Sequence, residues 1–309
     1  MKILCITPVK HINGLCENLE SLGVVEYHPD LTKQSAKGLI DSFDYDIIFC
    51  NPNKQNYILD DYILSNFKGT IITASTGLNH IDMVYCDLKR IDVVSLTTHY
   101  DVIEKISSTA EHSFALMMSL LRNIPSGFDD VKKCNWNYEN FIGRQLDKLT
   151  IGIIGYGRLG TMMERYCKAF GMKVIIHDPY KGYNNLQNLI KESDIITLHV
   201  HVSDETKYMI DKKLLTHMKK NSYIINTSRG EIVDEKAIIE SLKNNHLKGY
   251  ATDVIEDEFD NIKNSPILKG VDEGLNIIVT PHIAGMTKEA QEIAYNGVVE
   301  KYKIRRKND

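Results

Sequence analysis

The chain of 309 residues has no apolar run that approaches the ~18 residues a membrane-spanning helix requires. Its first apolar run ends at Pro8 and Lys10, which is too early for the core of a signal peptide, so we expect no such segment. A large excess of one charge is also missing. The net charge is −4, and acidic and basic residues are interspersed except in the terminal "KYKIRRKND". These absences predict a cytoplasmic protein with no membrane partner and no nucleic-acid partner.

The cysteines do not form a CxxC pair, although the chain has six of them. Because they are widely spread in a chain of this size, we interpret them as reduced structural thiols. His199 and His201 have the alternate spacing that places two imidazoles on one face of a strand. A third ligand cannot be identified, so the sequence predicts no metal site.

The composition is that of an ordinary globular protein, with 43% apolar and 25% charged residues. The length predicts two domains rather than one. The sequence contains no internal repeat of fixed short period, and no low-complexity linker marks a boundary between the two domains.

Apolar strand-like runs alternate with helical stretches along most of the chain, which is typical of a parallel sheet built from βαβ units. Five such runs come first, namely "KILCIT", "VVEYH", "DIIFC", "GTIITAS" and "DVVSL". A long helical stretch starting around Ser107 follows, with Thr109 as a candidate cap and Glu111 in the first turn. Six further runs, from "LTIGIIG" to "LNIIVTP", match the strand count of a complete doubly wound dinucleotide-binding domain.

A glycine-rich loop follows the first strand of the second half, where Gly155, Gly157 and Gly160 have G-x-G-x-x-G spacing. We expect the first glycine to permit a tight turn, the second to let a pyrophosphate approach, and the third to let helix and strand pack closely. Asp178 ends the next strand, where a carboxylate accepts hydrogen bonds from ribose hydroxyls and repels a 2′-phosphate. NAD is therefore favoured over NADP, although the nearby Lys181 leaves the strictness of that choice open. The alternative is a glycine-rich turn that binds no ligand.

Three ionisable residues lie at or just after strand ends in the second half: Arg229, Glu258 and His282. Because a parallel sheet gathers its strand ends on one edge, the three are expected to share a cleft. An arginine can hold a carboxylate by two hydrogen bonds, and a histidine oriented by a glutamate can exchange a proton with a hydroxyl or carbonyl. Each also has a structural alternative: an ion pair with a nearby acid, a solvated acidic loop, and a chain reversal, respectively.

With these residues in place, the chain resembles the D-isomer-specific 2-hydroxyacid dehydrogenases over nearly its whole length. The matching segments are "STGLNHID", "STAEHSFALMMSLLRNI", "GIIGYGRLG", "VIIHDPY", "NTSRGEIVDEKAI", "GYATDVIEDE" and "TPHIAG". The resemblance implies an α/β fold in which a Rossmann-type doubly wound domain, residues 103–283, is inserted into a flavodoxin-like substrate domain. The latter comprises residues 1–102 and 284–309, so the C-terminal helix returns to it.

The resemblance also implies roles for residues at matching positions. Arg229 would bind the substrate carboxylate, His282 would be the general acid/base and Glu258 its partner. Ser75, Thr76 and Gly77 would present N–H groups to the carboxylate. Contacts with NAD would come from the following residues: Thr109, Gly155, Gly157, Arg158, Leu159, Gly160, Asp178, Val200, Thr206, Thr227 and Asp253.

We therefore expect an NAD-dependent oxidoreductase that transfers a hydride between nicotinamide and C2 of a small D-2-hydroxy or 2-oxo acid. Two alternatives remain: an NAD(H)-sensing binding protein on the same fold, and a formate or phosphite type of dehydrogenase. Phosphoglycerate dehydrogenases of this family have arginine at the position of Thr73, which argues against a phosphorylated substrate here. The family usually forms dimers, so a homodimer is expected.

Overall fold

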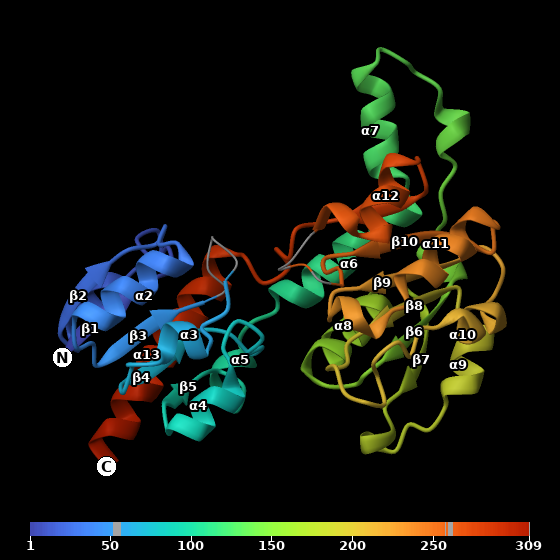
Figure 1. The fold of residues 1–309 in the computed structure, drawn as a ribbon. Helices are drawn as coiled ribbons and strands as arrows, with labels where there is room; N and C mark the ends of the chain where they lie inside the picture. Colours follow the sequence, from blue (N-terminus) through green and yellow to red (C-terminus); the bar gives the residue numbers. More distant parts are fainter. Residues whose placement is uncertain (52–56, 257, 259–261, 309) are drawn as a thin grey trace. The chain divides into compact units, whose positions relative to one another are not determined.

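The computed structural model describes residues 1–51, 57–256, 258 and 262–308 (Figure 1). The chain divides into two compact units, Met1–Ile106 with Met286–Asp309, and Ser107–Gly285. The second unit is thus one continuous segment between the two segments of the first. The sequence prediction had placed these boundaries after residues 102 and 283.

The first unit contains a parallel five-stranded sheet in the order β2-β1-β3-β4-β5, which is the flavodoxin-like order. Its strands are β1 (Lys2–Cys5), β2 (Val24–Tyr27), β3 (Ile47–Cys50), β4 (Thr70–Thr73) and β5 (Asp92–Val94). All five correspond to the predicted apolar runs. Nearly continuous apolar sequence is needed because side chains alternate between two covered faces: Ile3 and Cys5 enter one core cluster, and Leu4 and Ile6 enter the other.

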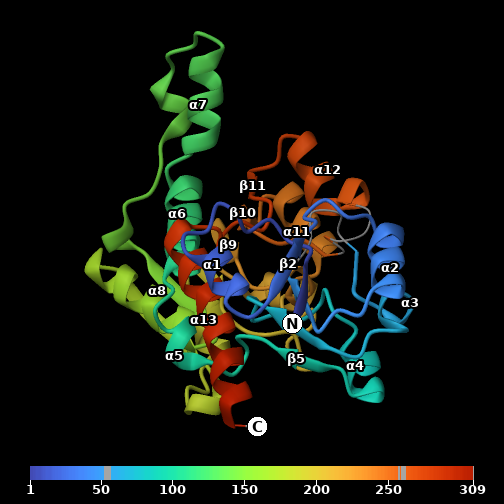
Figure 2. The same cartoon turned by 90° about the vertical axis from the view of Figure 1, so that its left-hand side faces the viewer.

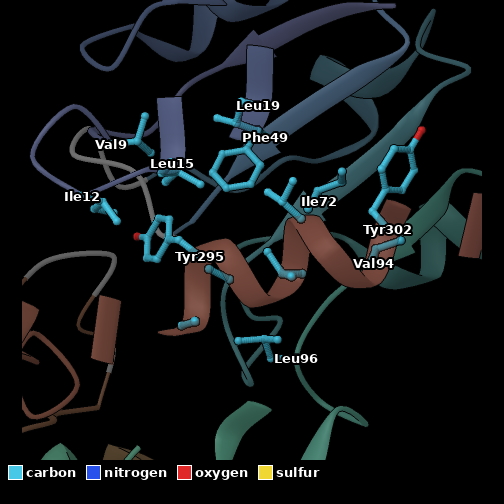
Figure 3. Packing of buried hydrophobic residues seen from close by; sticks show 14 of the residues in the cluster. Val9, Ile12, Leu15, Leu19, Phe49, Ile72, Val94, Leu96, Tyr295 and Tyr302 are labelled. Atoms are coloured by element: carbon cyan, nitrogen blue, oxygen red, sulfur yellow. The ribbon is translucent and has the colours of Figure 1, made fainter. Parts of the chain in front are cut away.

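Helices cover both faces of this sheet, namely α1 (Leu15–Glu20), α2 (Lys33–Ser42), α3 (Asp61–Leu64), α4 (Met83–Lys89), α5 (Tyr100–Ile103) and α13 (Lys288–Asn308). Figure 3 shows Tyr295 and Tyr302 of α13 in one cluster with Phe49, Ile72 and Val94 of the strands. Gly297 lets α13 approach α5, because a Cβ there would lie 2.6 Å from Val102 Cγ1. The C-terminal helix is therefore part of the core of the first unit.

The second unit contains a parallel six-stranded sheet in the order β11-β10-β9-β8-β6-β7. Its strands are β6 (Thr150–Ile154), β7 (Lys173–His177), β8 (Ile195–Leu198), β9 (Ser222–Asn226), β10 (Leu247–Thr252) and β11 (Ile277–Val279). The predicted doubly wound α/β fold is confirmed. Because β7 lies on one side of β6 and β8 on the other, the strand order reverses there, and the carboxyl ends of β6 and β8 flank the crevice where such sheets bind ligands.

The helices that cover this second sheet are α6 (Ser108–Leu121), α8 (Arg158–Ala169), α9 (Leu186–Glu192), α10 (Lys212–His217), α11 (Glu235–Lys243) and α12 (Pro266–Asp272). A further helix, α7 (Ile124–Lys132), has no buried side chain and lies outside these layers. The cluster under α6 and α8 takes Ile151 and Ile153 from β6, whereas the opposite cluster takes Ile154. The predicted cap of α6 was wrong: the helix begins at Ser108, one residue before Thr109, and Ser107 is its N-cap. Ser107 instead donates its hydroxyl hydrogen to Glu111 Oε1 at 2.5 Å.

The α7 helix and the chain that follows it project from the second unit as an arm beyond α6 (Figures 1 and 2). Its exposed apolar side chains include Phe128, Trp136, Tyr138 and Ile142, which are 64%, 87%, 79% and 82% exposed. Such a concentration of aromatic side chains on a surface is typical of a protein interface. Within the described residues, no helix is both long and apolar enough to cross a bilayer.

Candidate functional site

The glycine loop lies at the carboxyl end of β6, and α8 begins directly after it at Arg158. Gly155 has φ +89°, a conformation that favours glycine, and a Cβ there would lie 2.4 Å from the carbonyl oxygen of His199. A Cβ on Gly160 would lie 2.1 Å from the carbonyl oxygen of Gly155. Around Gly157, by contrast, no heavy atom of the described chain other than those of Gly157 and its two chain neighbours comes within 4 Å of the Cβ position. The open space lies at the N-terminus of α8, which suits a phosphate group.

Alanine substitutions at Gly160 and Gly157 are expected to affect different properties: the first the stability of the fold, the second the binding of the cofactor. We expect Gly160→Ala to lower the melting temperature, because its Cβ meets backbone that cannot rotate away. Gly157→Ala is expected to leave the melting temperature nearly unchanged, because the space around its Cβ is open. The same Cβ would occupy the space expected for the phosphate, so NADH binding should weaken by roughly tenfold or more, as much as the loss of about one hydrogen bond to a charged group. Thermal unfolding and NADH fluorescence titration on both variants measure the two effects. Equal melting temperatures for the two variants would contradict this division.

Asp178 follows β7, the neighbour of β6. Its Oδ2 accepts a hydrogen bond of 2.8 Å from the N–H of Tyr156 in the glycine loop. The backbone of Asp178 is paired with that of Tyr183 in both directions at 3.0 Å. The carboxylate is thereby fixed beside the loop, where dinucleotide-binding folds of this kind carry the acidic residue for the ribose.

Asp178 provides a test of cofactor choice. Asp178→Asn keeps an acceptor for the Tyr156 N–H but removes the negative charge, so we expect the ratio of NADH to NADPH affinity to fall by roughly tenfold or more. Titrating wild type and variant with both dinucleotides gives the ratio. An unchanged ratio would remove Asp178 from the cofactor site.

Two threonines of the expected cofactor site are joined by a residue that sequence reasoning missed. Ser113 on α6 donates to the carbonyl oxygen of Thr109 at 2.8 Å, and its hydroxyl lies 2.6 Å from that of Thr227 after β9. Ser113 therefore ties α6 to the carboxyl edge of the sheet. The Thr206 hydroxyl is engaged in its own turn, where it donates to the carbonyl oxygen of His201 and accepts from the N–H of Ser203. Val200 lies two residues after the end of β8.

Arg229 lies in a turn that begins where β9 ends. The side chain of Asn226 closes the turn, since it donates to the carbonyl oxygen of Arg229 at 2.8 Å and accepts from the N–H of Ser228 at 3.0 Å. The Ser228 hydroxyl donates to the carbonyl oxygen of Leu198 on β8 at 2.7 Å. Arg229 Nη1 donates to the Ser228 carbonyl at 2.6 Å. Neither Asn226 nor Ser228 was predicted as part of the site, although "NTSRG" contains both.

Among the three predicted catalytic residues, His282 and Glu258 are in direct contact. Nδ1 of His282 lies 2.9 Å from Glu258 Oε1 and 3.0 Å from Oε2. A carboxylate can only accept, so Nδ1 carries the proton and Nε2 is the ring nitrogen left for other partners. The His282 side chain is 43% exposed, whereas that of Glu258 is 17% exposed.

Two buried carboxylates hold the segments that carry this pair. Asp253, 1% exposed, follows β10 and accepts from the N–H groups of Ile283 and Ala284 at 2.9 and 2.8 Å. Glu235 on α11, 3% exposed, accepts from the N–H of Glu256 at 2.8 Å. Burial raises the pKa of the Glu235 carboxyl. Glu235 was also missed, because an acidic residue in the first turn of a helix reads as an ordinary exposed position.

The strand order places the three predicted catalytic residues along one edge. Arg229 follows β9, Glu258 follows β10 and His282 follows β11, and these strands are adjacent and parallel. Their carboxyl ends therefore point the same way. The hydrogen bonds between Glu258 and His282 weaken the structural alternatives, which were a solvated acidic loop for Glu258 and a chain reversal for His282.

The predicted carboxylate loop, residues 75–77, belongs to the first unit and follows β4. The N–H of Gly77 donates to Ser75 Oγ at 3.1 Å and is therefore engaged within the loop. Thr73 precedes the loop, is fully buried, and lies with its hydroxyl 2.9 Å from His80 Nε2. Burial lowers the pKa of His80 to about 4.

The histidines of "LHVHV" have different surroundings. His199 Nε2 lies 2.9 Å from the Thr197 hydroxyl, and burial lowers the pKa of His199 to about 4, whereas His201 is exposed. Over the residues that the structure describes, no group of three or more His, Cys, Asp or Glu is arranged to hold a metal ion.

Comparison with known proteins agrees with this geometry. Residues 114–284 match the family model described as "D-isomer specific 2-hydroxyacid dehydrogenase, NAD binding domain". The chain is 33% identical to D-3-phosphoglycerate dehydrogenase of Methanocaldococcus jannaschii over 98% of its own length and 57% of that protein's. It is 30% identical to 2-hydroxyacid dehydrogenase A of Aspergillus oryzae, over 92% of this chain and 83% of that one. Thus it spans little more than half of the first relative.

Among solved structures, D-lactate dehydrogenase of Aquifex aeolicus in complex with NAD and lactic acid is similar, with 30% identity and a TM-score of 0.79. The similarity covers 100% of this chain and 96% of that one. The open space at Gly157 and the fixed carboxylate of Asp178 suit NAD, the cofactor of the matched domain. The chain therefore belongs to the D-isomer specific 2-hydroxyacid dehydrogenases and carries their NAD-binding domain.

Proposed function

We propose that the protein is an NAD-dependent oxidoreductase that interconverts a small 2-oxo acid and the corresponding D-2-hydroxy acid. The observation that carries this proposal is the pairing of His282 Nδ1 with both carboxylate oxygens of Glu258, at 2.9 and 3.0 Å. That pairing leaves Nε2 as the nitrogen that exchanges a proton with substrate. His282 lies on the same sheet edge as Arg229, which follows β9, and the dinucleotide crevice begins at β8, the strand next to β9.

Bound NADH supplies the hydride for C2 of the oxo acid. His282, protonated on both nitrogens, donates the Nε2 proton to the C2 oxygen as the hydroxyl forms. In the oxidative direction the bare Nε2 accepts that proton, and Glu258 stabilises the positive charge that the ring then carries. Because the carboxylate holds Nδ1, the ring keeps one orientation through both directions.

Arg229 would bind the carboxylate of the substrate. Its guanidinium presents donors in a planar fork that matches a carboxylate, which fixes the acid with C2 toward His282. The Asn226 side chain and the Ser228 backbone hold the turn on which Arg229 lies. Thr73 occupies the position where phosphoglycerate dehydrogenases of the family have an arginine. Its neutral, buried side chain offers no positive charge to a phosphate group, which favours an acid without one.

The test is to mix the purified protein with NADH and a panel of 2-oxo acids, plain and phosphorylated, and to follow the nicotinamide absorbance. We expect oxidation of NADH with at least one plain 2-oxo acid that has a side chain. NADH that binds tightly but is oxidised by no acid would favour a sensing protein on the same fold. Activity with formate or phosphite alone, measured with NAD, would favour that type of dehydrogenase.

We further propose that the protein is a cytoplasmic homodimer whose interface includes the α7 arm. The cytoplasm is supported by the free state of Cys5, Cys16, Cys50, Cys86, Cys134 and Cys167. The dimer is supported by the exposed aromatic residues of the arm. Sedimentation of wild type and of a Phe128→Asp, Trp136→Asp variant compares the masses, and a monomeric wild type would contradict the dimer.

A further inference from the structure

The turn that carries His282 is held by one residue, Asp253, and His282 itself has an unfavourable backbone conformation. His282 has φ +54°, in the left-handed region that residues other than glycine adopt infrequently and at a cost in free energy. The carbonyl oxygen of Asp253 accepts from the His282 N–H at 2.9 Å. The side chain of Asp253 accepts from the next two N–H groups, those of Ile283 and Ala284. Asp253 thus binds three successive N–H groups and fixes the direction of the imidazole.

A chain of hydrogen bonds leads from Asp253 to a second histidine. The Thr280 hydroxyl lies 2.5 Å from Asp253 Oδ1, and a hydroxyl facing a carboxylate oxygen must donate. Since threonine has one hydroxyl hydrogen, Thr280 can only accept from its other neighbour, His112 Nε2, at 2.9 Å. His112 therefore carries its proton on Nε2. The same nitrogen lies 3.5 Å from Asp253 Oδ1, so a partial positive charge also faces the buried carboxylate.

His112 lies on α6, across the sheet edge from the turn, and its side chain is 21% exposed. The helix packs on β10 and β11, and Asp253 and Thr280 are the residues that directly follow these two strands. The His112 donor therefore approaches the Asp253 carboxylate from α6, whereas the other described donors to this carboxylate belong to the turn itself. Without this donor, the negative charge of the buried Asp253 carboxylate is less well compensated. This carboxylate organises the turn.

We propose that His112 is a positioning residue for the reaction: it donates to Thr280 and, through Thr280 and Asp253, holds the turn that orients His282. The kinetic consequence rests on the proposed function, whereas the structural consequence does not. Removing the donor releases the turn, so kcat falls while the glycine loop still binds NADH.

The first experiment compares His112→Leu, which keeps apolar bulk, with His112→Gln, whose amide reaches a similar position and can donate. We expect kcat to fall roughly 10- to 100-fold in the leucine variant, a larger change than any in NADH affinity, because the glycine loop and Asp178 are left intact. In the glutamine variant kcat should stay within about threefold of wild type, since a donor is retained. His217→Leu on α10 is the matched control, because this exposed histidine bonds only the carbonyl of Lys213 and the hydroxyl of Thr216 among its described contacts. Unchanged kcat in His112→Leu, or equal losses in both His112 variants, would overturn the proposal.

Thr280 supplies a second route if the leucine variant folds poorly. Thr280→Val breaks the chain at its middle, whereas Thr280→Ser keeps the hydroxyl. If His112 acts through Thr280, the effects of His112→Leu and Thr280→Val are not additive, and the double variant is no slower than the worse single one. Fully multiplicative losses would contradict a path through Thr280.

Amide hydrogen exchange separates this inference from the proposed function, because it needs no substrate. In His112→Leu the amides of Ile283 and Ala284 are expected to exchange at least about tenfold faster than in wild type and in His217→Leu. Faster exchange in a protein that reduces no 2-oxo acid would refute the proposed function alone. Unchanged exchange in an active enzyme would refute the role of His112 alone.

Discussion

Replacing His282 by asparagine lowers kcat by roughly 10²- to 10⁴-fold, the usual contribution of a positioned general acid/base, and leaves NADH affinity unchanged. Asparagine is chosen because it tolerates the left-handed backbone conformation at φ +54° better than alanine does. Its amide also stays able to donate to Glu258. The variant therefore keeps the turn and loses only a group that can give and take a proton.

Steady-state kinetics and NADH titration on the purified variant measure the two quantities. Glu258→Gln is the companion variant: it removes the charge beside Nδ1 while preserving size, so a smaller loss in kcat is expected than for His282→Asn. Turnover of His282→Asn within a few-fold of wild type would exclude His282 as the acid/base.

The second large effect is expected at Arg229. Substitution by lysine keeps the charge but removes the planar fork, so kcat/KM for the 2-oxo acid should fall by roughly 10²- to 10³-fold, as when one partner of a close charge pair is truncated. Both KM and kcat are expected to change, because the fork holds the acid and also sets the position of C2. The NADH affinity should not change.

A matched control is Arg165→Lys, since Arg165 is an exposed arginine of the same unit, on α8. Kinetics with varied 2-oxo acid at saturating NADH give KM and kcat separately. An Arg229→Lys variant with the kinetics of the control would place the substrate carboxylate elsewhere. A large loss accompanied by a lower melting temperature would instead assign Arg229 the structural role of an ion pair.

The strands of both sheets were predictable because parallel strands covered on two faces require continuous apolar sequence, as in "GTIITAS" and "SYIIN". The glycine loop was predictable for a similar reason, since Gly155 and Gly160 sit where a Cβ would meet backbone. The start of α6 was not. Both Ser107 and Thr109 are residue types that cap helices, so residue type alone does not distinguish between them.

The residues that support the site were harder to find than the charged residues at its centre. Ser113 and His112 lie on a helix whose apolar pattern accounts for its burial, so their polar contacts with Thr227 and Thr280 depend on how α6 meets the sheet. Glu235 bonds a loop some 20 residues away, a contact set by the approach of α11 to the end of β10. Sequence spacing contains no signal for any of these three contacts.

The most direct test of the proposed reaction is isotope transfer. NADH that carries deuterium at the reactive C4 position is incubated with the enzyme and its best 2-oxo acid, and the product is analysed by NMR and chiral chromatography. We expect one equivalent of D-2-hydroxy acid per NADH consumed, with deuterium at C2. Product without deuterium at C2, or of the L configuration, would contradict hydride transfer to an acid held as proposed by Arg229 and His282.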